Sequence, residues 1–405
     1  MVAAFARTVQ QHVHARLVGL FSSTSPVNKF SAIILAAQKL AARVPKDDWL
    51  VIAWSLIFKL VLIGFGMISF HINSNAALPA DHGPLQIWNR WDSIHYLQLA
   101  KAGYSAVTPW KAWFYPLYPW SVRAVQHVTG DYLVAGFVVS AIGLLAVVIL
   151  LRRLICVDFS REVGLRAVWF LLIFPTAYFL QIAYTESLFL ALAIGSIFAA
   201  RRERWWAAGG LGALAWMTRA NGAVLVPTLA VEAAYQWWTT KRWNWHWLWI
   251  ALVPLGFAVY LLLNWRVTGD PFTALRMRKT ISVTSWAWPW TGMRGTLGNM
   301  HRTPGEGELV GAQELYFSLL GLTCVVASWI KLRPLYAVWA TGNWLLVNAV
   351  TFIESVPRYT LVIFPLFIFF GLIGANRLWN GVITVWSLLF LSLFSSLFVR
   401  GWWAF

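Results

Sequence analysis

The stretch WLVIAWSLIFKLVLIGFGMISFH, residues 49–71, has the composition of one long apolar helix. Lys59 is its only Asp, Glu, Lys or Arg residue. At about 1.5 Å per residue, such a helix would be about 35 Å long, which is enough to cross the roughly 30 Å hydrocarbon core of a bilayer. The stretch therefore predicts a transmembrane helix.

The composition of the whole chain extends this interpretation. Of its 405 residues, 59% are hydrophobic and only 12% are charged, which is typical of a chain with many membrane spans. Its 28 tryptophans suit the membrane interface, where an apolar ring can keep its N–H hydrated. The sequence predicts an all-α, polytopic membrane protein.

Further apolar segments follow the first. We expect about eleven transmembrane helices in one membrane domain, residues 48–405, preceded by a cytoplasmic N-terminal segment, residues 1–47. Within that segment, residues 30–43 are expected to form a helix on the cytoplasmic membrane surface. The expected spans are residues 49–71, 132–151, 163–180, 183–200, 205–219, 221–238, 246–265, 313–330, 335–353, 359–375 and 378–399.

The basic residues predict the sidedness of these spans. The net charge of +17 is better explained by topology and anionic lipid than by nucleic acid, which we do not expect as a partner. With the N-terminus inside, the short loops that contain RR at 152, RRER at 201, KR at 241 and KLR at 331 all fall on one side. Short basic loops are typically cytoplasmic. The long loops 72–131 and 266–312, the first carrying interfacial helices, then face the extracytoplasmic side.

Unusual polar residues gather on that extracytoplasmic side. An ionisable group near membrane depth is costly and therefore suggests a function. Their shared placement suggests a single site. They are Asp92, His95, Glu186, Arg219, Asn221, Glu354 and Arg358.

The segment NRWDSIHYLQLAKAGY, residues 89–104, is expected to form a short interfacial helix that ends at Gly103. Spacing of three or four would place Trp88, Asp92, His95 and Leu99 on one face. A carboxylate partly desolvated by indole rings gains base strength, and the histidine could orient it, share a proton or contact a phosphate. The alternative is a helix cap beside an interfacial histidine.

Glu186 and Arg219 lie at two further outer turns. The carboxylate needs a partner, either Arg219 or an acceptor hydroxyl, and could equally form a structural ion pair. Beside Asn221, the guanidinium of Arg219 suits a phosphate, which it can grip through two N–H groups, or it could extend toward lipid head groups.

The third outer turn, ESVPRY, adds Arg358 and Tyr359. Arg358 is a second candidate phosphate ligand, unless it only pairs with Glu354. Aromatic residues complete the candidate site. Trp91 and Tyr115 could contact substrate, although the segment WFYPLYPW, residues 113–120, must be loop or broken helix and could instead anchor the interface.

The sequence contains no motif that predicts a cofactor. Cys156 and Cys324 are its only cysteines, so neither a disulfide nor a metal-thiolate cluster is expected. It has no Walker loop, Rossmann glycine fingerprint or HExxH motif, which makes a nucleotide-sugar donor less expected than a donor already in the membrane.

Four blocks in order resemble the PIG-V family of mannosyltransferases and its bacterial relatives. They are WDSIHYLQLAKAGY with FYPLYP, then FPTAYFLQIAYTESLF, TRANG and PRY. The resemblance implies a GT-C fold, a polyprenyl-phosphate sugar donor, inversion at the anomeric carbon and no cofactor. By position it makes Asp92 the general base, in a site on the extracytoplasmic face of a bacterial inner membrane.

The expected function is transfer of a hexose, with mannose favoured, to an extracytoplasmic glycolipid or glycan acceptor. Asp92 would take the proton, and Arg219 and Arg358 would stabilise the departing phosphate, with His95 assisting. Glu186 would bind sugar hydroxyls or hold Arg219. Membrane lipids are the other expected partners. The rival interpretations are a transporter or flippase of a lipid-linked sugar and a non-catalytic GT-C-like partner subunit.

Overall fold

A computed structural model of the chain describes residues 45–74, 79, 83–281, 285–299 and 311–403. Helices dominate these residues, which also include an isolated antiparallel bridge between Trp286 and Val350. The chain divides into two compact units, Met1–Leu50 and Val51–Phe405. The predicted surface helix at residues 30–43 lies outside the described residues.

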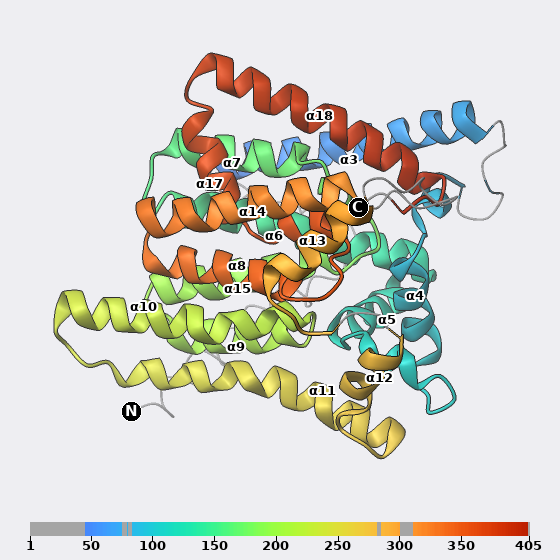
Figure 1. The fold of residues 1–405 in the computed structure, drawn as a ribbon, viewed down its shortest axis with the longest axis horizontal. Coiled ribbons are helices and arrows are strands. Elements are labelled where there is room, and N and C mark those ends of the chain that lie inside the picture. Colours follow the sequence, from blue (N-terminus) through green and yellow to red (C-terminus); the bar gives the residue numbers. More distant parts are fainter. Residues whose placement is uncertain (1–44, 75–78, 80–82, 282–284, 300–310, 404–405) are drawn as a thin grey trace, which may run out of the picture. The chain divides into compact units, whose positions relative to one another are not determined.

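The helices are labelled in Figure 1. Those of the first half are α3 (Lys46–Ser74), η1 (Gly83–Trp88), α4 (Asp92–Ala102), η2 (Pro109–Trp113), α5 (Leu117–Thr129), α6 (Tyr132–Ile155), α7 (Arg161–Ile173), η3 (Ala177–Leu180), α8 (Glu186–Arg201) and α9 (Trp205–Trp216). Those of the second half are η4 (Ala220–Val224), α10 (Leu225–Thr240), η5 (Trp245–Leu252), α11 (Val253–Thr268), α12 (Thr273–Ile281), α13 (Pro289–Asn299), α14 (Ala312–Lys331), α15 (Pro334–Asn348), α16 (Val356–Thr360), α17 (Pro365–Ile373) and α18 (Arg377–Val399).

Five described helices are long and apolar enough to cross a membrane by length and composition. This supports an integral membrane protein, but it does not confirm a count of eleven spans. The other apolar helices are shorter than the predicted segments. The five candidate spans are Lys46–Ile72, Tyr132–Ile155, Trp245–Thr268, Ala312–Lys331 and Arg377–Val399.

Two of the predicted spans are interrupted at prolines. The segment 163–180 ends as α-helix at Ile173, just before Pro175, and the segment 359–375 is broken at 361–364, between α16 and the start of α17 at Pro365. Proline lacks a backbone N–H and disfavours helical geometry in the residue before it, so it begins helices more readily than it continues them. The predicted boundaries were therefore wrong at these two breaks.

Several helices of the larger unit pack side by side. Helix α6 packs against α8, α8 against α9, and α9 against α11, while α7 packs against α17 and α14 against α15. Figure 1 shows α6, α8, α9, α11, α14 and α15 running roughly parallel, with α4 and α5 at one end of them. Their contact surfaces form one continuous apolar core.

Hydrogen bonds tie together the turns at the end where α4 lies. The Tyr184 hydroxyl, just before α8, donates to the backbone oxygen of Arg90, just before α4, at 2.9 Å. The Thr176 hydroxyl donates to the backbone oxygen of Pro357, in α16, at 3.0 Å. Three segments far apart in sequence therefore meet at this end of the helices.

An ion-pair network lies at the other ends of the same helices. Arg201, the last residue of α8, donates to both oxygens of Asp158 at 2.6 and 2.7 Å. Arg333 donates to both oxygens of Glu232 at 2.7 and 2.8 Å, and Tyr336 donates to Asp158 at 3.0 Å. Arg201 of the RRER motif and Arg333 of the KLR motif thus belong to one network, since Arg201 Nε also lies 3.6 Å from Glu232 Oε1.

The helix predicted around Asp92 is present but begins later than expected. Helix α4 starts at Asp92, and Gly103 ends it with φ 80°, as predicted. Trp88 belongs to the separate η1, where it is buried and stacks on Phe398 with 6.0 Å between ring centroids. The prediction that Trp88 shares a helix face with Asp92 was therefore wrong.

Candidate functional site

Two carboxylates and two guanidiniums form a continuous chain where the turns meet. Arg358 lies between the carboxylates, with Nη1 2.7 Å from Asp92 Oδ2 and Nε 2.5 Å from Glu186 Oε1. Arg219 Nη1 donates to the same Glu186 oxygen at 2.5 Å and to the hydroxyl of Thr185 at 2.7 Å. The charges of the four groups balance.

Exposure distinguishes Asp92 from the other three. The side chains of Glu186, Arg358 and Arg219 are 0, 4 and 8% exposed, whereas that of Asp92 is 28% exposed. Buried charges need partners, and each of the three buried groups has one. Asp92 is therefore the most accessible member of the cluster.

Helix ends position both carboxylates. Asp92 is the first residue of α4 and Glu186 is the first residue of α8, where the positive end of the helix dipole favours an anion. Trp91, which precedes Asp92, has a left-handed φ of 52° that turns the chain sharply into α4. Such strain in a bulky residue persists only where its surroundings enforce it.

Gly222 positions Arg219. In the TRANG turn its backbone approaches Trp216 so closely that an added Cβ would lie 2.3 Å from Trp216 Cα. Only glycine fits there without moving the turn, because real Cβ atoms do not approach other heavy atoms so closely. Close packing between α9 and η4 thus places Arg219 beside Glu186.

Aromatic rings surround the arginines. The Arg358 guanidinium lies 4.7 Å from the ring centroid of Tyr184 and 4.9 Å from that of Phe179, and Arg219 lies 5.3 Å from that of Tyr359. Such contacts stabilise cations. Burial opposes the charged form of Arg358, but the carboxylates of Glu186 and Asp92 outweigh it and hold the pKa of Arg358 well above its usual value.

Each arginine keeps donors for a further ligand. Among the described residues, no hydrogen-bond partner engages Nη2 of Arg358 or Nε and Nη2 of Arg219. Asp92 likewise uses Oδ2 for Arg358, and no described residue donates to its Oδ1. The cluster can therefore offer an acceptor oxygen and several cationic N–H groups to a molecule bound beside Asp92.

Glu314 holds the start of the helix that carries Arg358, a role that was not predicted from the sequence. Its carboxylate accepts the backbone N–H groups of Ser355 at 3.2 Å and Val356 at 2.7 Å, at the start of the short α16 that carries Arg358. A buried carboxylate three residues into an apolar span was a signal that could have identified it.

Glu314→Ala is expected to leave two buried N–H groups unpaired and to loosen α16 around Arg358. The free energy of unfolding should fall by about 1–3 kcal/mol. Thermal unfolding in detergent should show the lower stability. Unchanged unfolding would contradict the role of Glu314 as a cap. Thr323→Ala, on the same helix, is the control and should unfold as wild type does, since Thr323 is exposed and bonds only the backbone oxygen of Leu319.

His95 and Asn221 lie in packed surroundings. The His95 ring packs against Trp110 and Phe114, at centroid distances of 5.0 and 5.4 Å, and its buried Nδ1 has no hydrogen-bond partner among the described residues. Arg358, not His95, contacts the Asp92 carboxylate. The amide of Asn221 donates to Asn343 on α15 at 2.8 Å, an interaction that ties η4 to α15.

The aromatic candidates pack against other rings. Trp91 meets Trp403 edge-on at 4.9 Å, and Tyr115 stacks on Tyr260 at 4.1 Å. Burial raises the pKa of Tyr115, so its phenol stays protonated at neutral pH. Tyr359 contacts Arg219, as described above. Pro116 and Pro119 of WFYPLYPW lie at the N-cap and first turn of α5, where proline is tolerated.

The ion pairs of Arg358 and Glu186 bear on two alternatives that the sequence left open. The described ion pairs of Arg358 are with Asp92 and Glu186, and not with Glu354, which the sequence offered as the alternative to a phosphate role. Glu186 has the predicted partner Arg219 and a second one, Arg358. No group of three or more His, Cys, Asp or Glu side chains in the described part of the chain could hold a metal ion.

Comparisons with known proteins place these residues in a family. Residues 77–243, which contain Asp92, Glu186 and Arg219, match the sequence profile described as Mannosyltransferase (PIG-V). No curated protein of similar sequence was found.

Among solved structures, the chain is similar to the archaeal oligosaccharyltransferase AglB from Archaeoglobus fulgidus, in complex with an inhibitory peptide and a dolichol-phosphate. The two share 10% sequence identity and a TM-score of 0.43, over 87% of this chain and 56% of that chain. This chain therefore spans about half the length of that protein.

The family match and the apolar helices together support a membrane glycosyltransferase. The resemblance to the PIG-V mannosyltransferases is confirmed over residues 77–243, which contain three of the four clustered charges.

Proposed function

We propose that the chain is an inverting glycosyltransferase that transfers a hexose, with mannose favoured by the family match, from a polyprenyl-phosphate donor. The observation that carries the proposal is the Asp92–Arg358–Glu186–Arg219 cluster. It joins one accessible carboxylate to two buried cations. Direct displacement of a phosphate from a sugar calls for these two kinds of group.

In the proposed reaction, an acceptor hydroxyl oxygen bonds to the anomeric carbon from the face opposite the phosphate. The bond between that carbon and the phosphate oxygen breaks, and the electron pair leaves with the polyprenyl phosphate. Asp92 takes the hydroxyl proton. The remaining N–H groups of Arg358 and Arg219 stabilise the charge that develops on the leaving phosphate.

Arg358 would link the proposed base, Asp92, to the donor phosphate. Its Nη1 donates to Asp92, while its Nη2 has no partner among the described residues. On binding, the donor phosphate competes for the guanidinium and leaves Oδ2 of Asp92 open to the acceptor hydroxyl. Glu186 keeps both arginines in place, and because its side chain is fully buried we assign it this role rather than contact with sugar hydroxyls.

The donor preference can be tested with the full-length protein in liposomes. We expect transfer from radiolabelled polyprenyl-phosphate mannose to a glycolipid in a panel of acceptors, and none from GDP-mannose. Transfer from GDP-mannose alone would contradict the donor assignment. Movement of the lipid-linked sugar across the bilayer without transfer would instead indicate a flippase.

The proposed site lies on the extracytoplasmic face of a bacterial inner membrane. In a variant that lacks Cys156 and Cys324, cysteines at the exposed positions Lys101 and Arg294 are expected to react with an impermeant maleimide from outside the cell. A cysteine at Glu203 should react only after permeabilisation. The reverse pattern would place the Asp92 cluster on the cytoplasmic side.

A further inference from the structure

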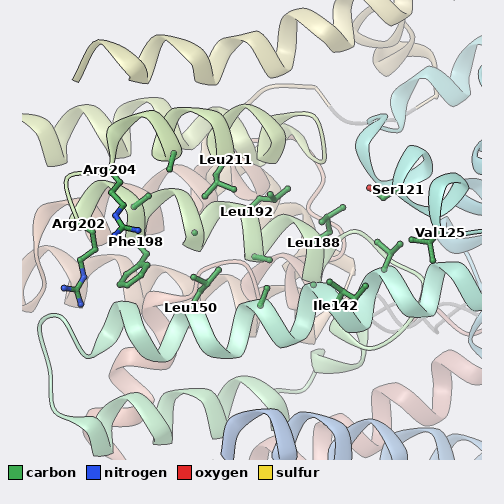
Figure 2. A pocket seen from close by; sticks show the side chains of 17 residues that line it. Ser121, Val125, Ile142, Leu150, Leu188, Leu192, Phe198, Arg202, Arg204 and Leu211 are labelled. Carbon is green, nitrogen blue, oxygen red and sulfur yellow. The ribbon is translucent and has the colours of Figure 1, made fainter. Parts of the chain in front are cut away.

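A long apolar groove runs along the helix pair α6 and α8 and is bordered by α9. Its cavity encloses about 540 Å³ and is lined by Ile142 and Leu150 of α6, Leu192 of α8 and Leu211 of α9. Figure 2 shows Arg202 and Arg204 at one end of the groove and Ser121 and Val125 at the other. The walls are formed by apolar side chains, and the end that contains Arg202 and Arg204 is cationic.

Small side chains leave this groove open. Gly195 on α8 and Ala146 on α6 line it. An added Cβ on Gly195 would come within 3.3–3.4 Å of Leu211 and Leu150, so a larger residue there would narrow the cavity. From Leu188 to Arg202 the α8 wall is about 21 Å long at 1.5 Å per residue, a length that suits an extended hydrocarbon chain.

The two arginines differ from their neighbour Arg201. Arg201 is held by both oxygens of Asp158. Arg202 and Arg204 are exposed, and in the part of the chain that the structure describes no carboxylate forms an ion pair with either. The guanidinium of Arg202 instead lies over the ring of Phe198, a groove residue, at 5.4 Å. The positive charges at this end of the groove are therefore not neutralised by any described carboxylate.

We propose that the groove binds a membrane phospholipid with an anionic head group. Its phosphate would contact Arg202 and Arg204, and one of its hydrocarbon chains would lie along α6 and α8. The charge complementarity selects an anionic lipid over a zwitterionic one. An apolar peptide or a second copy of the chain would leave the two guanidiniums without an anion.

This lipid site is separate from the proposed catalytic site. Glu186 begins α8, and Arg202 follows its last residue, so the two lie about 24 Å apart along the helix axis at 1.5 Å per residue. The groove residues Leu188 and Leu192 also lie on a different face of α8 from Glu186. The inference does not depend on the proposed function.

The experiment is native mass spectrometry of the full-length protein in detergent, titrated with phosphatidylglycerol or with phosphatidylethanolamine of the same chain length. Wild-type protein should bind phosphatidylglycerol more tightly. The double variant R202A/R204A should bind it about 10- to 30-fold more weakly, since each basic residue near an anionic lipid contributes about one kcal/mol. Equal binding by this variant and wild type would overturn the proposal.

Two matched variants separate the parts of the proposed site. R242A/R377A removes two exposed arginines that do not line the groove and should bind phosphatidylglycerol as wild type does. An equal loss in this control would indicate unspecific charge attraction and overturn the proposal. Ala146→Phe fills the groove while both arginines remain, and it should weaken binding of both lipids. Unchanged binding would overturn the assignment of the hydrocarbon chain to this groove.

Inorganic phosphate serves as the soluble probe. At millimolar concentration it should not displace phosphatidylglycerol, because it lacks the chain that fills the groove. Displacement would indicate an anion site without a lipid requirement and would overturn the proposal. Thermal unfolding of each variant shows whether a loss of lipid reflects a loss of fold, and R202K/R204K, which keeps both charges, should retain the preference for phosphatidylglycerol.

Discussion

Asp92→Asn is expected to lower kcat for sugar transfer by about 100- to 10,000-fold, the usual contribution of a general base. Asparagine has nearly the same shape and can still accept the hydrogen bond from Arg358 Nη1. It cannot take a proton from the acceptor hydroxyl. KM for the donor should therefore change little while kcat collapses, and initial-rate kinetics in liposomes would measure both.

Asp270→Asn is the matched control for this experiment. Asp270 is also a partly exposed aspartate with an arginine nearby, Arg276 at 3.4 Å, and it lies in the turn after α11 rather than in the cluster. It should transfer sugar at the wild-type rate. Both variants should unfold at similar temperatures. Near-normal turnover of a folded Asp92→Asn protein would refute Asp92 as the base.

Arg358→Lys is expected to lower kcat/KM roughly 30- to 1000-fold. This corresponds to a loss of about 2–4 kcal/mol of transition-state stabilisation. Lysine keeps the positive charge. However, one ammonium cannot reproduce the fixed fork by which Arg358 reaches Asp92, Glu186 and a phosphate together. Most of the loss should appear in kcat/KM for the donor rather than for the acceptor, because the proposed ligand of Arg358 is the donor phosphate.

Arg333→Lys tests whether this loss is specific. Arg333 also grips a buried carboxylate, with two hydrogen bonds to Glu232, but in the network at the opposite ends of the helices. The same substitution there should cost stability and leave the kinetics of the remaining folded protein unchanged. If the two variants lose the same activity, or if neither changes donor kinetics, Arg358 has no specific role toward the phosphate.

Much of the architecture was predictable because membrane helices follow from local composition. The apolar run at residues 49–71 lies within α3, and the glycine after residue 102 ends α4. The pairing of Glu186 with Arg219 was also foreseeable, because a buried carboxylate needs a nearby cation. These predictions depend on single segments or on the energetic cost of burying one group.

The contacts of Arg358 could not be predicted in the same way. Glu354, four residues away, was the obvious partner in sequence, yet Arg358 contacts Asp92, 266 positions earlier in the chain. That contact exists because hydrogen bonds between distant turns bring α4, α8 and α16 together. Packing of this kind leaves no signal in any one segment. Likewise, Trp91 and Tyr115 show aromatic character in the sequence, but their ring partners Trp403 and Tyr260 emerge only from the fold.

The anomeric configuration of the transferred sugar tests the central claim most directly. The cluster offers one accessible carboxylate, Asp92, while Glu186 is fully buried and held by two arginines. One base supports a single displacement, which inverts the anomeric carbon, whereas retention requires a second group to act as nucleophile. NMR of the product formed from a polyprenyl-phosphate mannose of known configuration should therefore show inversion. A product with retained configuration would contradict the account.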